Sequence, residues 1–305
     1  MTTAAGPAAA PSRPLLALAW MMVAIASFVL MAIAGRAIQV EMNTFELMLY
    51  RSAVGFAVVC AVIAASRRGF AQVKTRHPAL HAKRNLFHYA GQNLWFYAVA
   101  AIPLGQLAAL EFTNPIWVAL FAPAFLGERL TGARIAAAAL GFVGVLIVAR
   151  PGVSPLGPGH AAALLAAVAF ALNTIFTRRI MAFDGVLCVL FWMTLSQGAM
   201  SLLLSLPGGL PLPSAAVAPW LLLVGLTGLT AHYALTSALG HAPAGVVAPM
   251  EFLRLPIIAF VGAWLYGEGL HVSVFLGAAL ILAGNLVSLR AETRRPHDRD
   301  APFSP

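Results

Sequence analysis

Two glutamates lie inside long apolar stretches of this sequence, where a carboxylate is energetically unfavourable. Glu111 and Glu251 are 140 residues apart, and similar apolar runs surround each of them. An ionised side chain near the centre of a bilayer costs about 2.5–3.5 kcal/mol even on the most lenient insertion scale. The pair therefore indicates a site that binds a cationic group or takes up protons. The alternative is that each acid pairs with a basic side chain and holds helices together.

A basic residue accompanies one of these acids but not the other. Arg254 follows Glu251 by three residues, so a continuous helix would place both side chains on one face. Arg254 is then either the counter-ion of Glu251 or an anchor for a carboxylate or phosphate of a ligand. Its counterpart in the first half is Asn114, so the two sites are chemically unequal. Arg51 is a further candidate within an apolar run, and its alternative role is to snorkel to the membrane surface.

Polar and aromatic residues occur together in two other apolar stretches. Gln92 and Trp95 belong to one, His232 and Tyr233 belong to the other, and His232 matches Gln92 at the offset of the two glutamates. Side chains of these types, when they face a cavity, can stack on a planar ligand and hydrogen-bond its edge. The alternatives are an interfacial belt for the aromatic residues and a helix–helix hydrogen bond for the histidine.

Prolines follow shortly after each buried acid, at Pro115 and Pro256. A proline leaves one backbone carbonyl without its donor and bends or breaks a helix. Broken helices at corresponding places in two halves of a chain point to a substrate site. We therefore expect helix discontinuities at both prolines. Glu128 and Glu268, which each follow a glycine, are expected to have structural roles at helix ends.

The composition excludes a soluble protein. Of the 305 residues, 61% are hydrophobic and 10% are charged, whereas soluble domains carry roughly 25% charged residues. The net charge of +9 does not indicate nucleic-acid binding, because the basic residues lie in short connectors between apolar runs. The two cysteines, Cys60 and Cys188, have neither the number nor the spacing of a disulfide framework or a metal site.

Ten apolar runs are long enough to cross a membrane. A spanning helix needs about 20 mostly apolar residues, because the hydrocarbon core is about 30 Å thick, and lipid permits helices rather than open strands. The runs lie near residues 15–35, 46–65, 85–102, 105–126, 132–149, 158–178, 186–206, 217–239, 243–265 and 270–289. We predict an all-α integral membrane protein with ten transmembrane helices.

The two halves of the chain are related by an internal duplication. Nine positions of the first half recur in the second at a constant offset of 140 residues. They are Pro103, Gly105, Ala108, Glu111, Phe112, Gly127, Glu128, Leu130 and Gly144, matched by Pro243, Gly245, Ala248, Glu251, Phe252, Gly267, Glu268, Leu270 and Gly284. Since each half has an odd number of runs, equivalent helices would cross the membrane in opposite directions. The sequence thus predicts two inverted five-helix repeats, an arrangement typical of secondary transporters.

The distribution of basic residues predicts the orientation and the units of the chain. With the N-terminus inside, fifteen of the nineteen Lys and Arg residues fall in cytoplasmic segments, so both termini are expected in the cytoplasm. The expected units are a disordered tail at 1–14, a first repeat at 15–149, a second repeat at 158–289 and a cytoplasmic tail at 290–305. Small residues in the last run of each half would pack within the fold or form a homodimer contact.

Two segments that follow the buried acids share a short pattern. They run from Phe112-Thr-Asn-Pro-Ile-Trp to Gly127-Glu-Arg-Leu, and from Phe252-Leu-Arg-Leu-Pro to Gly267-Glu-Gly-Leu. With the glycine-rich helices that follow them, they make residues 15–290 resemble the EamA-type branch of the drug/metabolite transporter superfamily. The resemblance implies a ten-helix carrier of small organic solutes in the bacterial inner membrane, working by alternating access. Members export metabolites or take up vitamins and cofactors such as riboflavin and S-adenosylmethionine, so the cargo stays open.

These observations favour a secondary transporter of a small organic metabolite or drug-like solute, with export favoured over uptake. The sequence has no Gly-x-x-x-x-Gly-Lys-Ser/Thr loop for ATP hydrolysis and implies no cofactor. The expected partners are a small-molecule substrate and the lipid bilayer, without nucleic acid. The main alternative is an uptake carrier of the riboflavin or S-adenosylmethionine type. A membrane-embedded lipid-processing enzyme would need a nucleophile, base or metal cluster at the membrane surface, and the sequence shows none.

Overall fold

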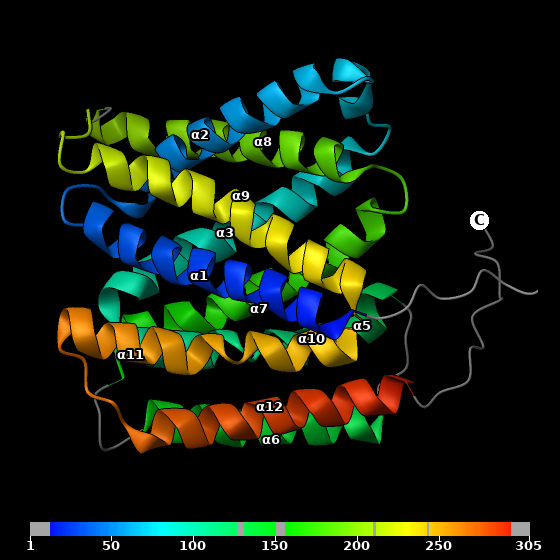
Figure 1. Ribbon diagram of the computed structural model, residues 1–305, viewed down its shortest axis with the longest axis vertical. Coiled ribbons are helices and arrows are strands. Elements are labelled where there is room, and N and C mark those ends of the chain that lie inside the picture. The colour runs from blue at the N-terminus through cyan, green and yellow to red at the C-terminus, as the bar shows by residue number, and fades with distance from the viewer. Residues whose placement is uncertain (1–12, 127–130, 151–155, 210–211, 243, 294–305) are drawn as a thin grey trace, which may run out of the picture.

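The computed structural model describes residues 13–126, 131–150, 156–209, 212–242 and 244–293, and these residues form helices without strands (Figure 1). The α-helices are α1 (Pro14–Ile38), α2 (Thr44–Ala65), α3 (Pro78–Ala101), α4 (Leu104–Glu111), α5 (Asn114–Leu126), α6 (Gly132–Ala149), α7 (Pro158–Ile180), α8 (Val186–Ser205), α9 (Ala218–His241), α10 (Ala244–Glu251), α11 (Arg254–Tyr266) and α12 (Val272–Thr293). Two short 3-10 helices, η1 (Gly69–Val73) and η2 (Leu206–Gly208), lie in connectors.

Eight segments of the described chain are long and apolar enough to cross a membrane. Two of the ten predicted runs, within α3 and α12, are not among them. The apolar stretch of α12 is shorter, Val272–Ser288. The helix α3 starts seven residues before its predicted run, at Pro78 rather than residue 85, and it carries buried polar residues such as His81, Arg84 and His88. Those residues face other helices instead of lipid, so the mean hydropathy of α3 falls below the value expected of a membrane-spanning helix.

The fourth and ninth runs are each broken into two helices. The break separates α4 from α5 at residues 112–113, and it separates α10 from α11 at residues 252–253. Each proline lies just after its break, Pro115 in the first turn of α5 and Pro256 in the first turn of α11. Proline fits a first turn because it has no backbone N–H to pair there, while it denies a donor to the carbonyl four residues earlier. The discontinuities therefore fall immediately before the prolines rather than at them.

The helices lie roughly side by side along the molecule, and their main packing pairs join the two halves (Figure 1). The most extensive contacts are those of α1 with α9, α3 with α7, α6 with α12 and α2 with α8, and α4 packs against α11. Each pair combines one helix from the first half of the chain with one from the second. The halves thus interlock and share one buried core, which extends from Ile25 to Ile281.

Glycines allow α6 and α12 to approach closely. A Cβ atom at Gly144 would lie 2.7 Å from the backbone oxygen of Gly277, and one at Gly277 would lie 2.5 Å from the backbone oxygen of Gly144. A Cβ atom at Gly284 would lie 2.8 Å from the oxygen of Ala137. Real Cβ atoms do not come this near to backbone, so these positions require glycine. Of the two roles expected for these small residues, the structure shows packing within the fold.

Candidate functional site

A cavity of about 330 Å³ lies in the interior, where both helix breaks meet α1, α2, α3, α7, α9 and α12. Its lining consists of Phe28, Met31, Arg51, His88, Gln92, Trp95, Phe96, Glu111, Phe112, Asn114, Pro115, Phe170, Asn173, Thr174, His232, Leu235, Glu251, Phe252, Arg254, Leu282, Asn285 and Leu286. Most of the residues singled out in the sequence are therefore brought together from helices far apart in the chain. Both halves contribute charged, amide and aromatic groups to one space.

An ion pair between the halves lies in the wall of this cavity. The Nη2 atom of Arg254 lies 3.0 Å from Oε1 of Glu111, and the indole N–H of Trp95 donates to Oε2 of the same carboxylate at 2.9 Å. The guanidinium also lies over the rings of Phe28 and Phe112, 4.8 and 4.9 Å from their centroids. Arg254 is 2% exposed, and the carboxylate and the aromatic faces compensate its burial, while its Nε atom has no hydrogen-bond partner.

The partner of Arg254 differs from the one that the sequence spacing suggested. Three-residue spacing pairs Arg254 with Glu251 when both stand on one helix. Here α10 ends at Glu251 and α11 begins at Arg254, so the break interrupts the helical register between them. Glu251 lines the cavity and, within the described residues, makes no hydrogen bond or ion pair. Its carboxyl group is consequently free to meet a ligand or a proton.

A second buried cation, Arg51, lies elsewhere in the lining. Its Nη1 atom donates to Oε1 of Gln92 at 3.1 Å, and its Nε atom has no hydrogen-bond partner. The guanidinium occupies the space beside Gly228, where an added Cβ would lie 2.6 Å from Nη2. Arg51 is 7% exposed and so does not snorkel to the surface. Its free donors make it suited to hydrogen-bond acceptors on a bound molecule.

Two imidazoles lie close to this arginine in the cavity wall. The ring of His232 lies 6.2 Å from that of His88 and 6.1 Å from that of Phe28, in both cases between ring centroids. The Nδ1 atom of His88 is 2.6 Å from Nε2 of Gln197, which fixes the orientation of that ring. His232 thus belongs to the cavity, as its match with Gln92 suggested.

Two predicted site residues lie outside the lining. Tyr233 is 66% exposed and packs edge-on against Trp20, with 5.7 Å between ring centroids. It follows His232 on α9, and adjacent residues of a helix point about 100° apart, so the two cannot both face the cavity. Pro256 is exposed on α11, whereas Pro115 contributes to the lining.

The lining also includes groups outside the predicted set of site residues. Phe112 and Phe252 stack at 4.3 Å between centroids and 27° between planes. The amide of Asn285 donates to the carbonyl of Phe112 at 3.1 Å, and that of Asn114 donates to the carbonyl of Ala167 at 3.1 Å. The duplication could have identified the two phenylalanines, because they are one of its nine matched pairs. No sequence signal marks Asn285, whose role depends on the helix break.

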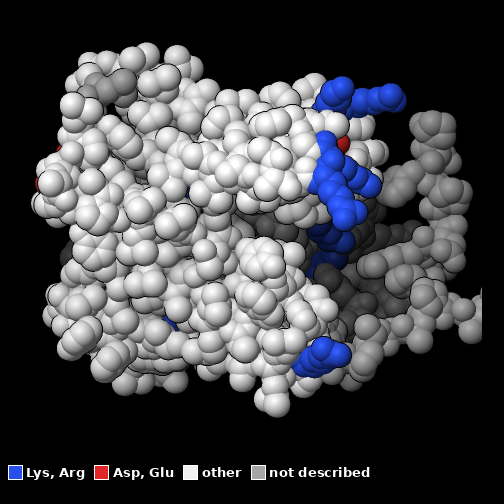
Figure 2. All heavy atoms as spheres, turned by 45° about the horizontal axis from the view of Figure 1, so that its top comes forward, with Lys and Arg blue, Asp and Glu red and all other residues white. Residues whose placement is uncertain are grey.

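A dense set of polar contacts joins helices at one end of the molecule. Arg36, near the end of α1, pairs with Glu268 and donates to the carbonyls of Val99 and Ile102 at 2.8 and 2.9 Å. The second oxygen of Glu268 accepts the backbone N–H of Leu104 at 2.8 Å. The Lys and Arg side chains gather at the other end (Figure 2). Glu268 therefore joins α1, α4 and α11, which exceeds the local helix-end role expected for it.

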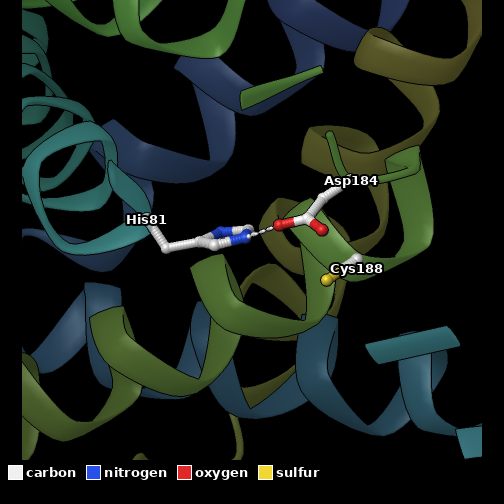
Figure 3. A group of neighbouring side chains, drawn as sticks. All are labelled: His81, Asp184 and Cys188. Atoms are coloured by element: carbon white, nitrogen blue, oxygen red, sulfur yellow. Dashed lines mark hydrogen bonds and ion pairs between the residues drawn. The ribbon is translucent and has the colours of Figure 1, made fainter. Parts of the chain in front are cut away.

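Three potential metal ligands cluster near the start of α8. Atoms of His81, Asp184 and Cys188 lie within 4.8 Å of one another (Figure 3). The carboxylate oxygen nearest the imidazole is already engaged, since it accepts from Thr75 and lies 2.8 Å from Nε2 of His81. Burial raises the pKa of Asp184, but the hydrogen bonds from Thr75 and His81 outweigh it and hold the pKa below its usual value. Through these hydrogen bonds the cluster links α3 to the α7–α8 connection.

Comparison with known proteins identifies the class of this chain. The model of the EamA-like transporter family matches residues 15–150 and 157–290. A riboflavin transporter of Rhizobium johnstonii is 30% identical over 285 residues, which cover 93% of this chain and 94% of that protein. A riboflavin transporter of Brucella anthropi is 30% identical over 233 residues, covering 74% of this chain and 82% of that protein.

More distant relatives agree with this assignment. An S-adenosylmethionine uptake transporter of Rickettsia felis is 22% identical over 275 residues, covering 90% of this chain and 92% of that protein. A solved crystal structure with 21% identity shares the fold with a TM-score of 0.62, covering 92% of this chain and 99% of that one. The protein belongs to the EamA-like transporter family and is a multi-pass transporter of the inner membrane.

Proposed function

We propose that this protein is a secondary transporter that takes up a planar, aromatic and uncharged solute of the riboflavin type. The observation that carries the proposal is the cavity at the two helix breaks, with its stacked aromatic rings and convergent amides. The names of the relatives from Rhizobium and Brucella support riboflavin as the cargo, and that of the Rickettsia relative supports uptake rather than export.

The aromatic lining suits a flat ring system. Phe112 and Phe252 stack beside the ion pair, and Trp95 lies in the same wall with its N–H turned towards Glu111. Aromatic groups prefer offset stacking or edge-on contact, and each such contact contributes about 0.5–1.5 kcal/mol beyond burial. The volume of about 330 Å³ lies in the range of roughly 300–1,000 Å³ typical of small-molecule sites. We infer that an isoalloxazine ring binds among these residues.

The charge balance of the lining favours an uncharged cargo. Two arginines and two glutamates line the cavity, so their formal charges cancel. A ligand with a net charge, such as the sulfonium of S-adenosylmethionine, would leave an excess charge in a space with little water. Riboflavin carries no charge at neutral pH, and its ring has carbonyl acceptors along one edge. We place that edge against the free donors of Arg51.

The inverted repeat is the proposed basis of movement. In the proposed repeat, α7, α8 and α9 are the counterparts of α1, α2 and α3. The contact of α1 with α9 then corresponds to the contact of α7 with α3, and α2 contacts its own counterpart α8, which fits a two-fold relation of the halves. Both helix breaks also fall at matching positions. We propose that units 15–149 and 158–289 rock about the cavity, that the Arg36–Glu268 end opens in the other state, and that both termini face the cytoplasm.

Reconstituted vesicles test the proposal. Purified protein in proteoliposomes should accumulate labelled riboflavin above protein-free vesicles, with saturation and with competition by unlabelled riboflavin. Labelled S-adenosylmethionine and a panel of amino acids serve as comparison cargoes, with and without a pH gradient. Vesicles preloaded with riboflavin measure the export direction. Uptake of S-adenosylmethionine in preference to riboflavin, or transport of neither, would exclude the proposed cargo.

A further inference from the structure

A second recess, of about 310 Å³, lies away from the transport cavity between the beginning of α3 and the end of α7. It is lined by Arg76, His77, Pro78, Ala79, Leu80, Lys83, Phe176 and Arg179. Pro78 begins α3 and Ile180 ends α7, so the recess lies at one end of this packed helix pair. The transport cavity shares no residue with it.

Three cations in this recess have no anionic partner. Arg76, Lys83 and Arg179 are exposed, and none of them forms an ion pair within the described part of the chain. Asp184, on the connection that follows α7, forms no ion pair with these three cations; its carboxylate contacts His81 (Figure 3) and accepts a hydrogen bond from Thr75. The concentration of positive charge is therefore available to an external anion.

The floor of the recess is apolar and ordered by ring stacking. Phe176 stacks on Phe87 at 5.6 Å and 4° and meets Phe125 edge-on at 5.7 Å. His77 stacks on Phe183 at 4.1 Å, and Phe183 is 62% exposed on the surface. The recess thus has cations in its lining and an exposed apolar ring, that of Phe183, beside it. A phospholipid has the same order of groups, with a phosphate above acyl chains.

We propose that this recess binds the phosphate head group of an anionic phospholipid, whose acyl chain lies along the exposed ring of Phe183. Basic pockets at the ends of membrane helices recognise such head groups, with about 1 kcal/mol, or roughly a fivefold change in affinity, for each cation near the surface. Arg179 and Arg76 supply forked donors to the phosphate oxygens and Lys83 supplies a compact charge. The lipid would join α3 to α7, the pair that carries Trp95 and Phe170 of the transport cavity.

Lipid titration of the full-length purified protein tests this assignment. The affinity for phosphatidylglycerol is measured by native mass spectrometry, and the thermal stability is measured in vesicles of phosphatidylglycerol or phosphatidylcholine. The double variant Lys83→Gln/Arg179→Gln should bind phosphatidylglycerol at least tenfold more weakly and lose the stabilisation that this lipid gives. The double variant Arg67→Gln/Arg68→Gln removes the same charge from exposed residues outside the recess and should keep both properties.

The outcomes distinguish a specific lipid-binding site from general electrostatic attraction between the lipid and the protein. Equal losses in the two double variants would show a diffuse charge effect and overturn the proposal, as would equal binding of phosphatidylcholine. Inorganic phosphate that displaces the lipid fully at matched concentration would identify a free-anion site instead. Lys83→Arg keeps the charge and should retain lipid binding, so loss in this variant would also contradict the assignment. Size-exclusion profiles establish that each variant is folded.

Discussion

At the scale of single residues, the site depends on a pairing that joins the two halves. Arg254 meets Glu111 rather than its sequence neighbour Glu251, which leaves one carboxylate paired and the other free. The sequence indicated that these residues belong to a site, since charged groups in apolar runs need a reason. It could not indicate which acid takes the arginine, because that choice depends on a helix break between residues 251 and 254.

The pairing predicts a specific pattern of thermal stability. Glu111→Gln leaves a buried guanidinium without its counter-charge, and breaking a buried pair costs up to about 3–5 kcal/mol, less the share that water screens around the partly exposed glutamate. Glu111→Gln/Arg254→Gln should be more stable than Glu111→Gln, because it removes both charges. Glu251→Gln is the matched control and should lower the melting temperature least. If Glu251→Gln is as destabilising as Glu111→Gln, the ion pair is assigned to the wrong acid.

The position of Arg51 predicts that a methyl group added at Gly228 will weaken recognition of the cargo. Gly228→Ala places a Cβ in the space of the guanidinium, whose flexible chain must move away. We expect a raised KM for riboflavin, by about tenfold if one charged hydrogen bond is lost, with little change in melting temperature. Gly240→Ala makes the same substitution on the same helix, where nothing lies within 4 Å of the new atom. An unchanged KM in Gly228→Ala would remove Arg51 from the recognition of the cargo.

At the scale of elements, the two broken spans position the site. The apolar runs and the prolines were visible in the sequence, and they predict the order of helices and the neighbourhood of the breaks. Hydropathy alone did not predict the length of α3, because buried polar residues such as His81 and Arg84 continue this helix before residue 85. Tyr233 shows a second limit: the sequence does not separate the roles of two adjacent residues, yet His232 lines the cavity and Tyr233 is exposed outside it.

The link between α3 and the α7–α8 connection predicts a dependence of stability on pH. The pKa of Asp184 is lower in the folded protein than its unfolded value of about 3.9. Its contribution is therefore fully present above that value and is lost as the pH falls through the folded pKa. Asp184→Asn should lower the melting temperature at pH 7 and reduce the further fall on acidification.

Melting curves between pH 3 and pH 7 measure this contribution. Glu41→Gln is the control, since Glu41 is an exposed acid near the opposite end whose carboxylate accepts a hydrogen bond from Ser214. This substitution should leave the dependence of the melting temperature on pH unchanged. An identical pH profile for Asp184→Asn and the unaltered protein would show that this carboxylate contributes nothing to stability.

At the scale of the whole molecule, the interlocked halves enclose one cavity with unequal ends. At one end Arg36 pairs with Glu268, and the basic residues gather at the other (Figure 2). The duplication in the sequence predicted two related halves, although no residue pattern could give the pairing of their helices or the shape of the space between them. The central claim is that a flat aromatic solute binds in that space.

Binding of riboflavin to the purified protein tests this claim most directly. Stacking on aromatic side chains should quench flavin fluorescence in a saturable manner for the unaltered protein. Phe112→Ala/Phe252→Ala removes the stacked pair and should weaken binding by at least about tenfold, since each aromatic contact contributes about 0.5–1.5 kcal/mol beyond its burial. Trp264→Ala, at a residue that is 74% exposed and outside the cavity, should bind as the unaltered protein does. Saturable binding that the double variant leaves unchanged would contradict the account.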